Sequence, residues 1–473
     1  MRRPASWGML NSRRIGRIFS HIDWRSRPPD PAPAAGGRRT NSYRAPLTAH
    51  TFTAVFLVAL AVSYSLRLWL ARRHERHVGT HRAAVPAAFT DRVTLPAHQK
   101  AADYTIARTR FERLETIFDA GVLAALTLGG VLGALVEWTG AWAVGPPWQD
   151  LALIVTVAVL ASVLALPFSY WRTFVIEAKF GFNRMTLGLW LADLAKGTLL
   201  AAVLGVPLAL VALWLMGAAG PLWWLWVWAV WIAFQLLLLA LYPTLIAPLF
   251  NTFSPLPAGA ARERIEALLA RCEFATRGLF VMDGSRRSSH GNAFFTGFGR
   301  GRRIVFFDTL LSRLAPDEIE AVLAHELGHF KRRHVQKRML WMAAVSLAFL
   351  ALLAQLMGAS WFYEGLGVPP AQDRPGVALI LFFLALPVFT FVFGPLASLY
   401  SRKHEFEADA FAARHASAAA LAQALVKLYE DNAATLTPDP LHSAFYDSHP
   451  PAAVRIARLG AAGPGASVRP AAA

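Results

Sequence analysis

The stretch AVLAHELGHFKRRHVQKRMLWMAAVSLAFLALLAQLM, residues 321–357, joins a candidate metal motif to an apolar run. His325 and His329 lie four residues apart, so on a helix both rings share one face and reach a single zinc ion. Glu326, beside the first histidine, is placed to hold a water at that ion and to move its proton. The apolar run is long enough to cross a bilayer, and we expect one helix to carry both parts.

The composition indicates a polytopic membrane protein. Of the 473 residues, 55% are hydrophobic and only 16% are charged, whereas a soluble protein usually has about a quarter charged residues. The net charge of +17 comes from arginines beside apolar runs, which is typical of spans held on their cytoplasmic side and not of nucleic-acid binding. We interpret the run KRRH, 331–334, in the same way, as interfacial anchoring. Cys272 is the single cysteine, which excludes an intramolecular disulfide and a cysteine-rich zinc site.

Seven apolar stretches predict seven transmembrane helices. They lie near 50–70, 117–143, 150–170, 187–216, 222–248, 339–358 and 376–399. Basic residues in the connections 72–113, 171–186 and 250–338 predict that the long middle segment and the C-terminus face the cytoplasm. The first 46 residues are rich in Arg, Pro and Gly, and we expect them to be disordered.

The segment between the fifth and sixth spans predicts a small sheet followed by the motif helix. RGLFVMD (277–283), NAFFTGF (292–298) and RIVFFDTLL (303–311) have the composition of strands. Pro316, followed by acidic residues, then marks the first turn of a helix that leads to His325. We therefore expect a mainly α membrane protein with a zincin-like α+β metallopeptidase part.

These boundaries predict five regions. They are a basic tail (1–46), a membrane region with five spans and a cytoplasmic loop (47–250), the metallopeptidase core (251–338), the last two spans (339–400) and a C-terminal helix with a tail (401–473).

A third metal ligand is predicted in SRKHEFEADAFAARH, 401–415. Glu405 and Asp409 are four residues apart, so on a helix Glu405 can bind the zinc ion while Asp409 accepts an N–H from a ligand histidine. Glu407 would point to another face, and His404 is the weaker competitor for ligation. Simple surface charge on a helix is the alternative for this cluster, and its pairing with His325 and His329 favours the metal site.

The sequence resembles the type I CAAX prenyl proteases, which are integral-membrane zinc metallopeptidases. The resemblance rests on HELGH, SRKHEFEADAFA and SHPPAAVRI, and extends to AADYTIARTRF (101–111), VIEAKFGFNRMT (175–186) and YPTLIAPLFNTFSPL (242–256). It implies seven helices that enclose a water-filled chamber, with one zinc ion per chain held near its cytoplasmic end.

The resemblance also implies roles for individual residues. His325, His329 and Glu405 would bind zinc, Glu326 would be the general base, and Asp409 would support a ligand. Asn292 and Ala293 would pair with the substrate backbone, whereas His449 and Arg455 would contact the substrate or stabilise the oxyanion. A proline-stopped helix start with a surface arginine is the alternative for the last two. Asp193 and Lys196, which are costly in lipid, would face the chamber.

Two other functions remain open at this point. One is a heat-shock-type zinc protease that degrades misfolded membrane proteins, and the other is a transporter or scaffold with structural zinc. We expect a monomer that acts on peptides or membrane-associated proteins. The Arg/Ala-rich composition suggests a bacterial inner-membrane protein, with the active site towards the cytoplasm.

Overall fold

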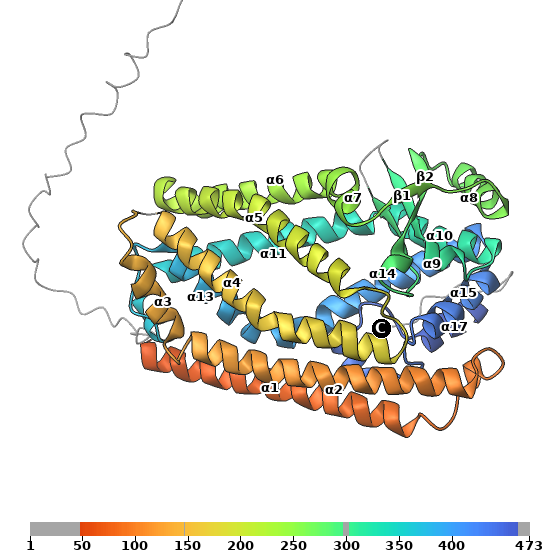
Figure 1. Cartoon of the computed structure of the whole chain (residues 1–473), viewed down its shortest axis with the longest axis horizontal. Helices are drawn as coiled ribbons and strands as arrows, with labels where there is room; N and C mark the ends of the chain where they lie inside the picture. Colours follow the sequence, from red (N-terminus) through yellow and green to blue (C-terminus); the bar gives the residue numbers. More distant parts are fainter. Residues whose placement is uncertain (1–47, 146, 297–301, 462–473) are drawn as a thin grey trace, which may run out of the picture. The chain divides into compact units, whose positions relative to one another are not determined.

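The computed structural model describes residues 48–145, 147–296 and 302–461, which are mainly helical (Figure 1). The predicted tail, 1–46, lies outside the described residues. Within these described ranges, six helical segments are long and apolar enough to cross a membrane. They are α1 (Ala49–Thr80), α4 with η2 (Trp148–Glu177), α5 (Leu187–Ala218), η3, α6, η4 and α7 (Gly220–Phe250), α11 (His334–Met357) and α13, η7 and α14 (Pro375–His415).

The predicted second span, 117–143, is a broken helix. α2 (Leu95–Leu126) and α3 (Val131–Gly140) meet at 49° and count as a seventh span only when taken together. The break contains Gly130, which has φ 77°, a backbone conformation that glycine adopts without a steric penalty. The seven predicted spans are therefore found as six continuous segments and one bent pair.

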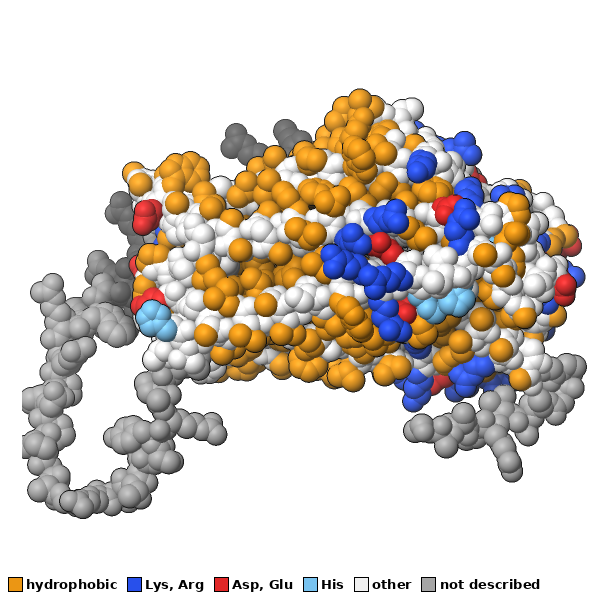
Figure 2. All heavy atoms as spheres, turned by 90° about the horizontal axis from the view of Figure 1, so that it is seen from below, with side chains coloured by type: hydrophobic (Ala, Val, Ile, Leu, Met, Phe, Trp, Pro, Cys, Tyr) orange, Lys and Arg blue, Asp and Glu red, His pale blue; other side chains and the backbone are white. Residues whose placement is uncertain are grey.

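Apolar side chains are spread over much of the face shown in Figure 2, and Lys and Arg side chains gather in a band across it. Some arginines in the basic connections form ion pairs with half-buried carboxylates. Arg113 lies 2.8 Å from Glu75 and joins α2 to α1, and Arg172 lies 2.5 Å from Glu115 and joins η2 to α2. Basic side chains at one end of apolar helices are typical of the membrane–water boundary.

Strands and shorter helices form the part of the chain that carries the metal motif. The sheet has the order β1-β2-β4-β3, in which β2 and β4 are parallel and the other pairs antiparallel. Its strands are β1 (Phe253–Pro255), β2 (Gly278–Met282), β3 (Ala293–Thr296) and β4 (Arg303–Phe307). The helices are α8 (Ala260–Arg271), α9 (Asp308–Leu311), α10 (Pro316–Lys331), α15 (Ala418–Asp431), α16 (Pro440–Tyr446) and α17 (Ala452–Ala461), and α12 (Ser360–Glu364) follows α11.

The structure changes three expectations about these elements. The predicted strand 303–311 ends at Phe307, because Asp308 begins the short helix α9. β1 was not predicted, since a strand of three residues has too little alternation to detect. The motif helix and the following span are separate helices. Arg333 has φ 58°, and this left-handed backbone conformation interrupts the helix between α10 and α11.

An apolar core holds the sheet against α10 and its neighbours. Leu268 of α8, Phe306 of β4 and Leu327 of α10 are fully buried together with Leu421 of α15. Pro316 occupies the first turn of α10, as predicted, and the Glu318 side chain accepts the Ala315 N–H at 2.7 Å. This packing fixes the helix that carries His325 and His329.

A buried ion pair joins the ends of the spans on the side opposite the metal motif. Asp150, at the start of α4, is 1% exposed and accepts hydrogen bonds from Arg374 Nε at 2.6 Å and from the Gly376 N–H at 2.9 Å. We expect Asp150→Ala to lower the free energy of unfolding in detergent by about 3–5 kcal/mol, because Arg374 then loses its carboxylate and keeps only long hydrogen bonds to Val136 and Thr139. Asp373→Ala, which removes a neighbouring exposed carboxylate, is the control. Equal stability of the two variants would contradict this role for Asp150.

Candidate metal centre

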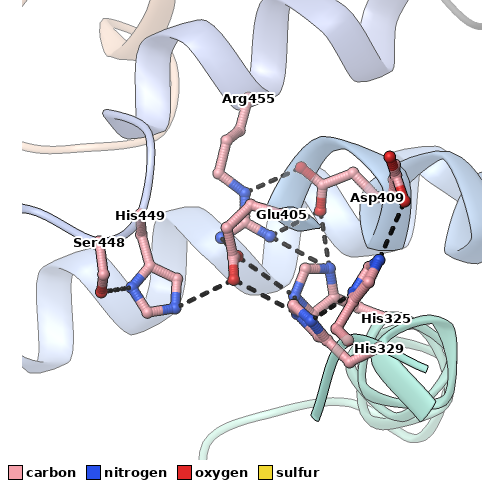
Figure 3. Close-up of polar contacts among 9 residues, drawn as sticks. His325, His329, Glu405, Asp409, Ser448, His449 and Arg455 are labelled. Carbon is pink, nitrogen blue, oxygen red and sulfur yellow. Dashed lines mark hydrogen bonds and ion pairs between the residues drawn. The ribbon is translucent and has the colours of Figure 1, made fainter. Parts of the chain in front are cut away.

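Helices α10 and α14 (Gly394–His415) bring the three predicted ligands together (Figure 3). Glu405 Oε2 lies 3.5 Å from His325 Nε2, and Glu405 Oε1 lies 3.3 Å from His329 Nε2. The two Nε2 atoms are 3.2 Å apart, and one ligand atom from each residue lies within 4.8 Å of the others. The side chains of His325 and Glu405 are 8% and 5% exposed. Three donors from two helices therefore converge on one point.

These three donors fit a zinc ion. Two imidazole nitrogens and a carboxylate are a donor set that zinc takes in catalytic sites, with one position left open. Glu405 Oε2 is buried and accepts no hydrogen bond from a described residue, and the nearest fixed cation, Arg455 Nη1, lies 3.7 Å away, so a closer cation would compensate this carboxylate better. Burial favours the neutral His325 ring, but the neighbouring carboxylates of Asp409 and Glu405 outweigh burial and raise the pKa of His325 to about 9. The surroundings thus favour an added positive charge.

Asp409 contacts His325 at Nδ1, the ring nitrogen away from the metal position, and Arg455 in turn holds Asp409. His325 Nδ1 lies 2.8 Å from Asp409 Oδ1, and Arg455 donates to both carboxylate oxygens, at 2.9 and 2.6 Å. A carboxylate only accepts, so Nδ1 carries a hydrogen, and in the neutral ring, which is the form that binds a metal, Nε2 has its lone pair at the metal position. The predicted partnership of Asp409 with a ligand histidine therefore has the required geometry. Arg455 is buried on these groups, and its predicted contact with the substrate stays a prediction.

The close packing of α10 on α14 depends on Gly328. A Cβ atom at this position would lie 2.9 Å from Ala408 Cα and 3.0 Å from Phe411 Cβ, which are atoms of the helix that carries Glu405. We expect Gly328→Ala to push the helices apart and to weaken zinc binding about 10–100-fold, since overpacking costs about 1–3 kcal/mol. Competition with a chelator measures this change. Gly358→Ala, where a Cβ meets no atom within 4 Å, should bind zinc like the wild type, and equal affinity of both variants would contradict the argument.

Glu326 and His449 flank the same centre. Glu326 is half-buried, and among the described residues its carboxylate has no hydrogen-bond or ion-pair partner. His449 Nε2 lies 3.4 Å from Glu405 Oε1, and its Nδ1 lies 3.1 Å from Ser448 Oγ. The His449 side chain is 62% exposed, so it can meet an incoming molecule. The predicted roles of both residues remain proposals.

Asn292 and Ala293 lie at an edge of the sheet that no other described strand covers. β3 is the last strand in the sheet order, and the Phe307 N–H donates to the Asn292 carbonyl at 2.9 Å. Hydrogen-bonded positions alternate along an antiparallel pair, so the backbone of Ala293 and Phe295 faces away from β4. The Asn292 side chain accepts the Ala293 N–H at 2.8 Å. The edge can accept an extended chain as an additional strand.

Asp193 and Lys196 of α5 both have polar partners. Asp193 forms a two-point ion pair with Arg287, at 2.8 and 3.0 Å. Lys196 Nζ donates to the Leu249 carbonyl at 2.9 Å. These contacts satisfy both side chains within the protein, and they tie α5 to α7 through Lys196 and to the segment before β3 through Asp193. Their predicted position on a chamber wall stays a prediction.

The interpretation of KRRH as interfacial anchoring is wrong for His334. This residue is 4% exposed, and its Nδ1 lies 3.1 Å from Nδ1 of His329. Its Nε2 lies 3.0 Å from Glu407 Oε2, so the other face predicted for Glu407 is occupied by a histidine. His334 follows His329 by five residues, a spacing that does not align on one helix, and the break at Arg333 could not be recognised from the sequence. His404 stacks on His334 and is not part of the donor set.

Comparisons with known proteins agree with this geometry. Residues 74–252 match the CAAX prenyl protease N-terminal model, described as five membrane helices, and residues 255–462 match peptidase family M48. A CAAX prenyl protease 1 homolog from Oryza sativa is 36% identical over 76% of this chain and 86% of its own length. CAAX prenyl protease 1 from Saccharomyces cerevisiae is 35% identical over 66% and 72% of the two chains. Both relatives are eukaryotic, and they give no support to the expected bacterial source.

A solved structure shows the same fold. The crystal structure of S. mikatae Ste24p has a TM-score of 0.81 and 29% sequence identity, and covers 86% of this chain and 99% of its own. The two matched models are consecutive, and the boundary between them falls at β1, directly after the last of the first five spans. From the sequence match and the fold, with which the arrangement of the candidate ligands agrees, this chain belongs to the CAAX prenyl protease 1 family of M48 membrane metallopeptidases.

Proposed function

We propose that the chain is a zinc endopeptidase that processes the C-termini of CAAX-type, membrane-associated proteins. The observation that carries the proposal is the convergence of His325, His329 and Glu405 beside a free carboxylate, Glu326, in a chain of this family. The names of the relatives supply the substrate class. One zinc ion per chain would be held by the three converging donors.

The side chains around this position have complementary tasks. Bound zinc would supply a Lewis acid that polarises a peptide carbonyl and acidifies water. The Glu326 carboxylate takes the proton of the attacking water and passes it to the departing amine, so the proton moves from water to product through one residue. His449, on the exposed side of Glu405, donates a hydrogen bond to the carbonyl oxygen as negative charge develops there. Asp409 and Arg455 keep the His325 ring in one orientation.

The open edge of β3 supports a binding mode for the peptide. Backbone hydrogen bonds to Ala293 and Phe295 would hold the substrate as an extended strand, whatever its side chains are. The Asn292 side chain would release the Ala293 N–H and turn to the peptide. A substrate paired with β3 would have its scissile bond at a fixed distance from the metal position on α10. Attack by water requires such a fixed position.

The membrane-spanning helices support access from the bilayer. In the most apolar stretches of α1, α4, α5, α6 and α11, only 6–17% of the residues are buried inside the protein. Such open packing agrees with helices that face lipid on one side and a water-filled chamber on the other. The basic connections support a metal centre on the cytoplasmic side. By composition, the membrane would be a bacterial inner membrane.

Two other functions are weaker. The heat-shock-type protease has fewer spans than this chain, although a role in clearing misfolded membrane proteins would use the same chemistry. Membership of a peptidase family and the free Glu326 carboxylate argue against a scaffold or transporter with structural zinc.

Direct cleavage assays test the proposal. Purified protein in detergent or liposomes should release the residues after the farnesylated cysteine of a CAAX peptide, and a chelator should stop the reaction. A misfolded membrane protein, assayed in parallel, represents the first alternative. Cleavage of that protein alone would favour the quality-control function, and zinc-loaded protein that cleaves neither substrate would favour the scaffold.

A further inference from the structure

We propose that His334 and Glu407 form a hydrogen-bonded relay that positions the zinc ligand His329. The inference rests on the proposed zinc site and deepens it, because it assigns His329 a support that corresponds to Asp409 behind His325. Neither residue would touch zinc or substrate, so both are positioning residues. The relay runs from His329 through His334 to Glu407.

The distances define this relay. His329 Nδ1 and His334 Nδ1 are 3.1 Å apart, and His334 Nε2 lies 3.0 Å from Glu407 Oε2. On the other side of the His329 ring, Nε2 is the atom that faces His325 and Glu405. The His329 ring is therefore held at one nitrogen by His334, and its second nitrogen is left for the metal position.

Hydrogen-bonding chemistry fixes the direction of each bond. The Glu407 carboxylate only accepts, so His334 Nε2 carries a hydrogen. The neutral His334 ring then has its lone pair on Nδ1, which accepts the hydrogen of His329 Nδ1. His329 Nε2 is left with a lone pair, which is the form that binds zinc. The carboxylate of Glu407 thus selects the tautomer of His329 through one intervening ring.

The surrounding residues keep His334 in place. The His404 ring stacks on the His334 ring, with centroids 4.0 Å apart and planes at 9°, and Tyr400 packs on His404. Arg333 has φ 58°, an unusual conformation for a residue other than glycine. Because of this turn, α11 begins with His334 next to His329. The backbone conformation and the stacking on His404 therefore both hold the His334 ring in place. Strain of this kind persists only where neighbouring structure enforces it.

The relay also connects three separate elements. His329 belongs to α10, His334 begins α11, and Glu407 belongs to α14, two residues after Glu405. Loss of the relay should therefore leave the ligand atoms present but free the His329 ring to rotate. Changes of supporting groups of this kind typically reduce metal affinity or activity by about 10–100-fold.

The test compares four variants of the full-length protein in detergent. His334→Asn keeps an acceptor near the position of Nδ1, whereas His334→Gln keeps a polar group near Nε2 and leaves His329 without an acceptor. Glu407→Ala removes the far end of the relay. His404→Phe keeps the stacked ring and is the matched control. Chelator competition gives the zinc affinity, and the visible spectrum of the Co²⁺-substituted protein reports the geometry of the site.

We expect His334→Gln and Glu407→Ala to lose about 10–100-fold in zinc affinity and to alter the Co²⁺ spectrum. His334→Asn should recover most of the affinity, and His404→Phe should match the wild type within about threefold. Wild-type affinity and spectrum in both His334→Gln and Glu407→Ala would overturn the proposal, as would equal losses in His334→Asn and His334→Gln. Thermal melting shows which variants fold, and Glu407, which is 32% exposed, can be changed with little disturbance of packing.

The outcome is independent of the substrate. If wild-type protein binds zinc but cleaves no peptide, the proposed peptidase function fails, and the comparison of zinc affinities still decides the relay. If peptide cleavage is present and the variants bind zinc normally, the relay fails alone.

Discussion

Glu326→Gln is expected to lower kcat/KM for peptide cleavage at least about 1,000-fold while zinc stays bound at about one ion per chain. Glutamine has the size of glutamate but cannot take a proton from water, and general-base catalysis contributes about 10²–10⁴-fold. Glu326 is not among the three converging donors, so metal affinity should not depend on its charge. Peptide turnover and elemental zinc analysis of the same purified sample measure the two effects.

The control for this variant is Asp317→Asn, which removes a carboxylate from the first turn of the same helix. It should retain wild-type turnover, apart from a small loss of stability from the charge at the helix N-terminus. Turnover of Glu326→Gln within tenfold of the wild type would remove Glu326 from the mechanism. Loss of zinc in that variant would instead show that Glu326 belongs to the ligand set.

His325→Ala is expected to abolish stoichiometric zinc binding. The wild type should hold about one zinc ion per chain, and the variant should bind about 10³-fold more weakly, because one of three protein ligands supplies about a third of a binding free energy of roughly 12 kcal/mol. Peptide cleavage should disappear with the metal. Equilibrium dialysis followed by zinc analysis measures the affinity directly.

His415→Ala separates loss of a ligand from loss of a histidine. His415 lies at the end of α14, where its Nδ1 contacts the Phe411 carbonyl at 2.9 Å, and it is outside the converging donors. This variant should keep its zinc. Normal zinc stoichiometry in His325→Ala would contradict the ligand assignment, whatever its activity.

Hydropathy predicted the membrane part well, because the free energy of burying apolar side chains in lipid depends on length and composition and little on context. The break between α2 and α3 was missed, since the glycines at 129–130 lie in an apolar stretch that reads as one span. The change from β4 to α9 was also missed. Phe306 and Phe307 continue into Asp308 without a turn signal, and only the tertiary structure ends the strand there.

The residues that face the metal position were predictable because each pair lies on one helix at a four-residue spacing. His325 with His329 and Glu405 with Asp409 both have this regularity. His334 was misinterpreted, since its contact with His329 is made across a helix break, and its basic neighbours gave a stronger signal for the membrane boundary. The contacts of Arg455 with Asp409 also depend on how α17 packs on α14, which the SHPPAAVRI motif does not reveal.

Helix α14 runs without interruption from Gly394, within the apolar segment Pro375–His415, to the turn that carries Glu405 and Asp409. Eleven residues of helix span about 16 Å, so a one-degree tilt of this segment moves Glu405 by roughly 0.3 Å. Such tilts are how membrane helices adapt to lipid tails of different length. The thickness of the surrounding bilayer is thus mechanically connected to the distance between a carboxylate and two imidazoles.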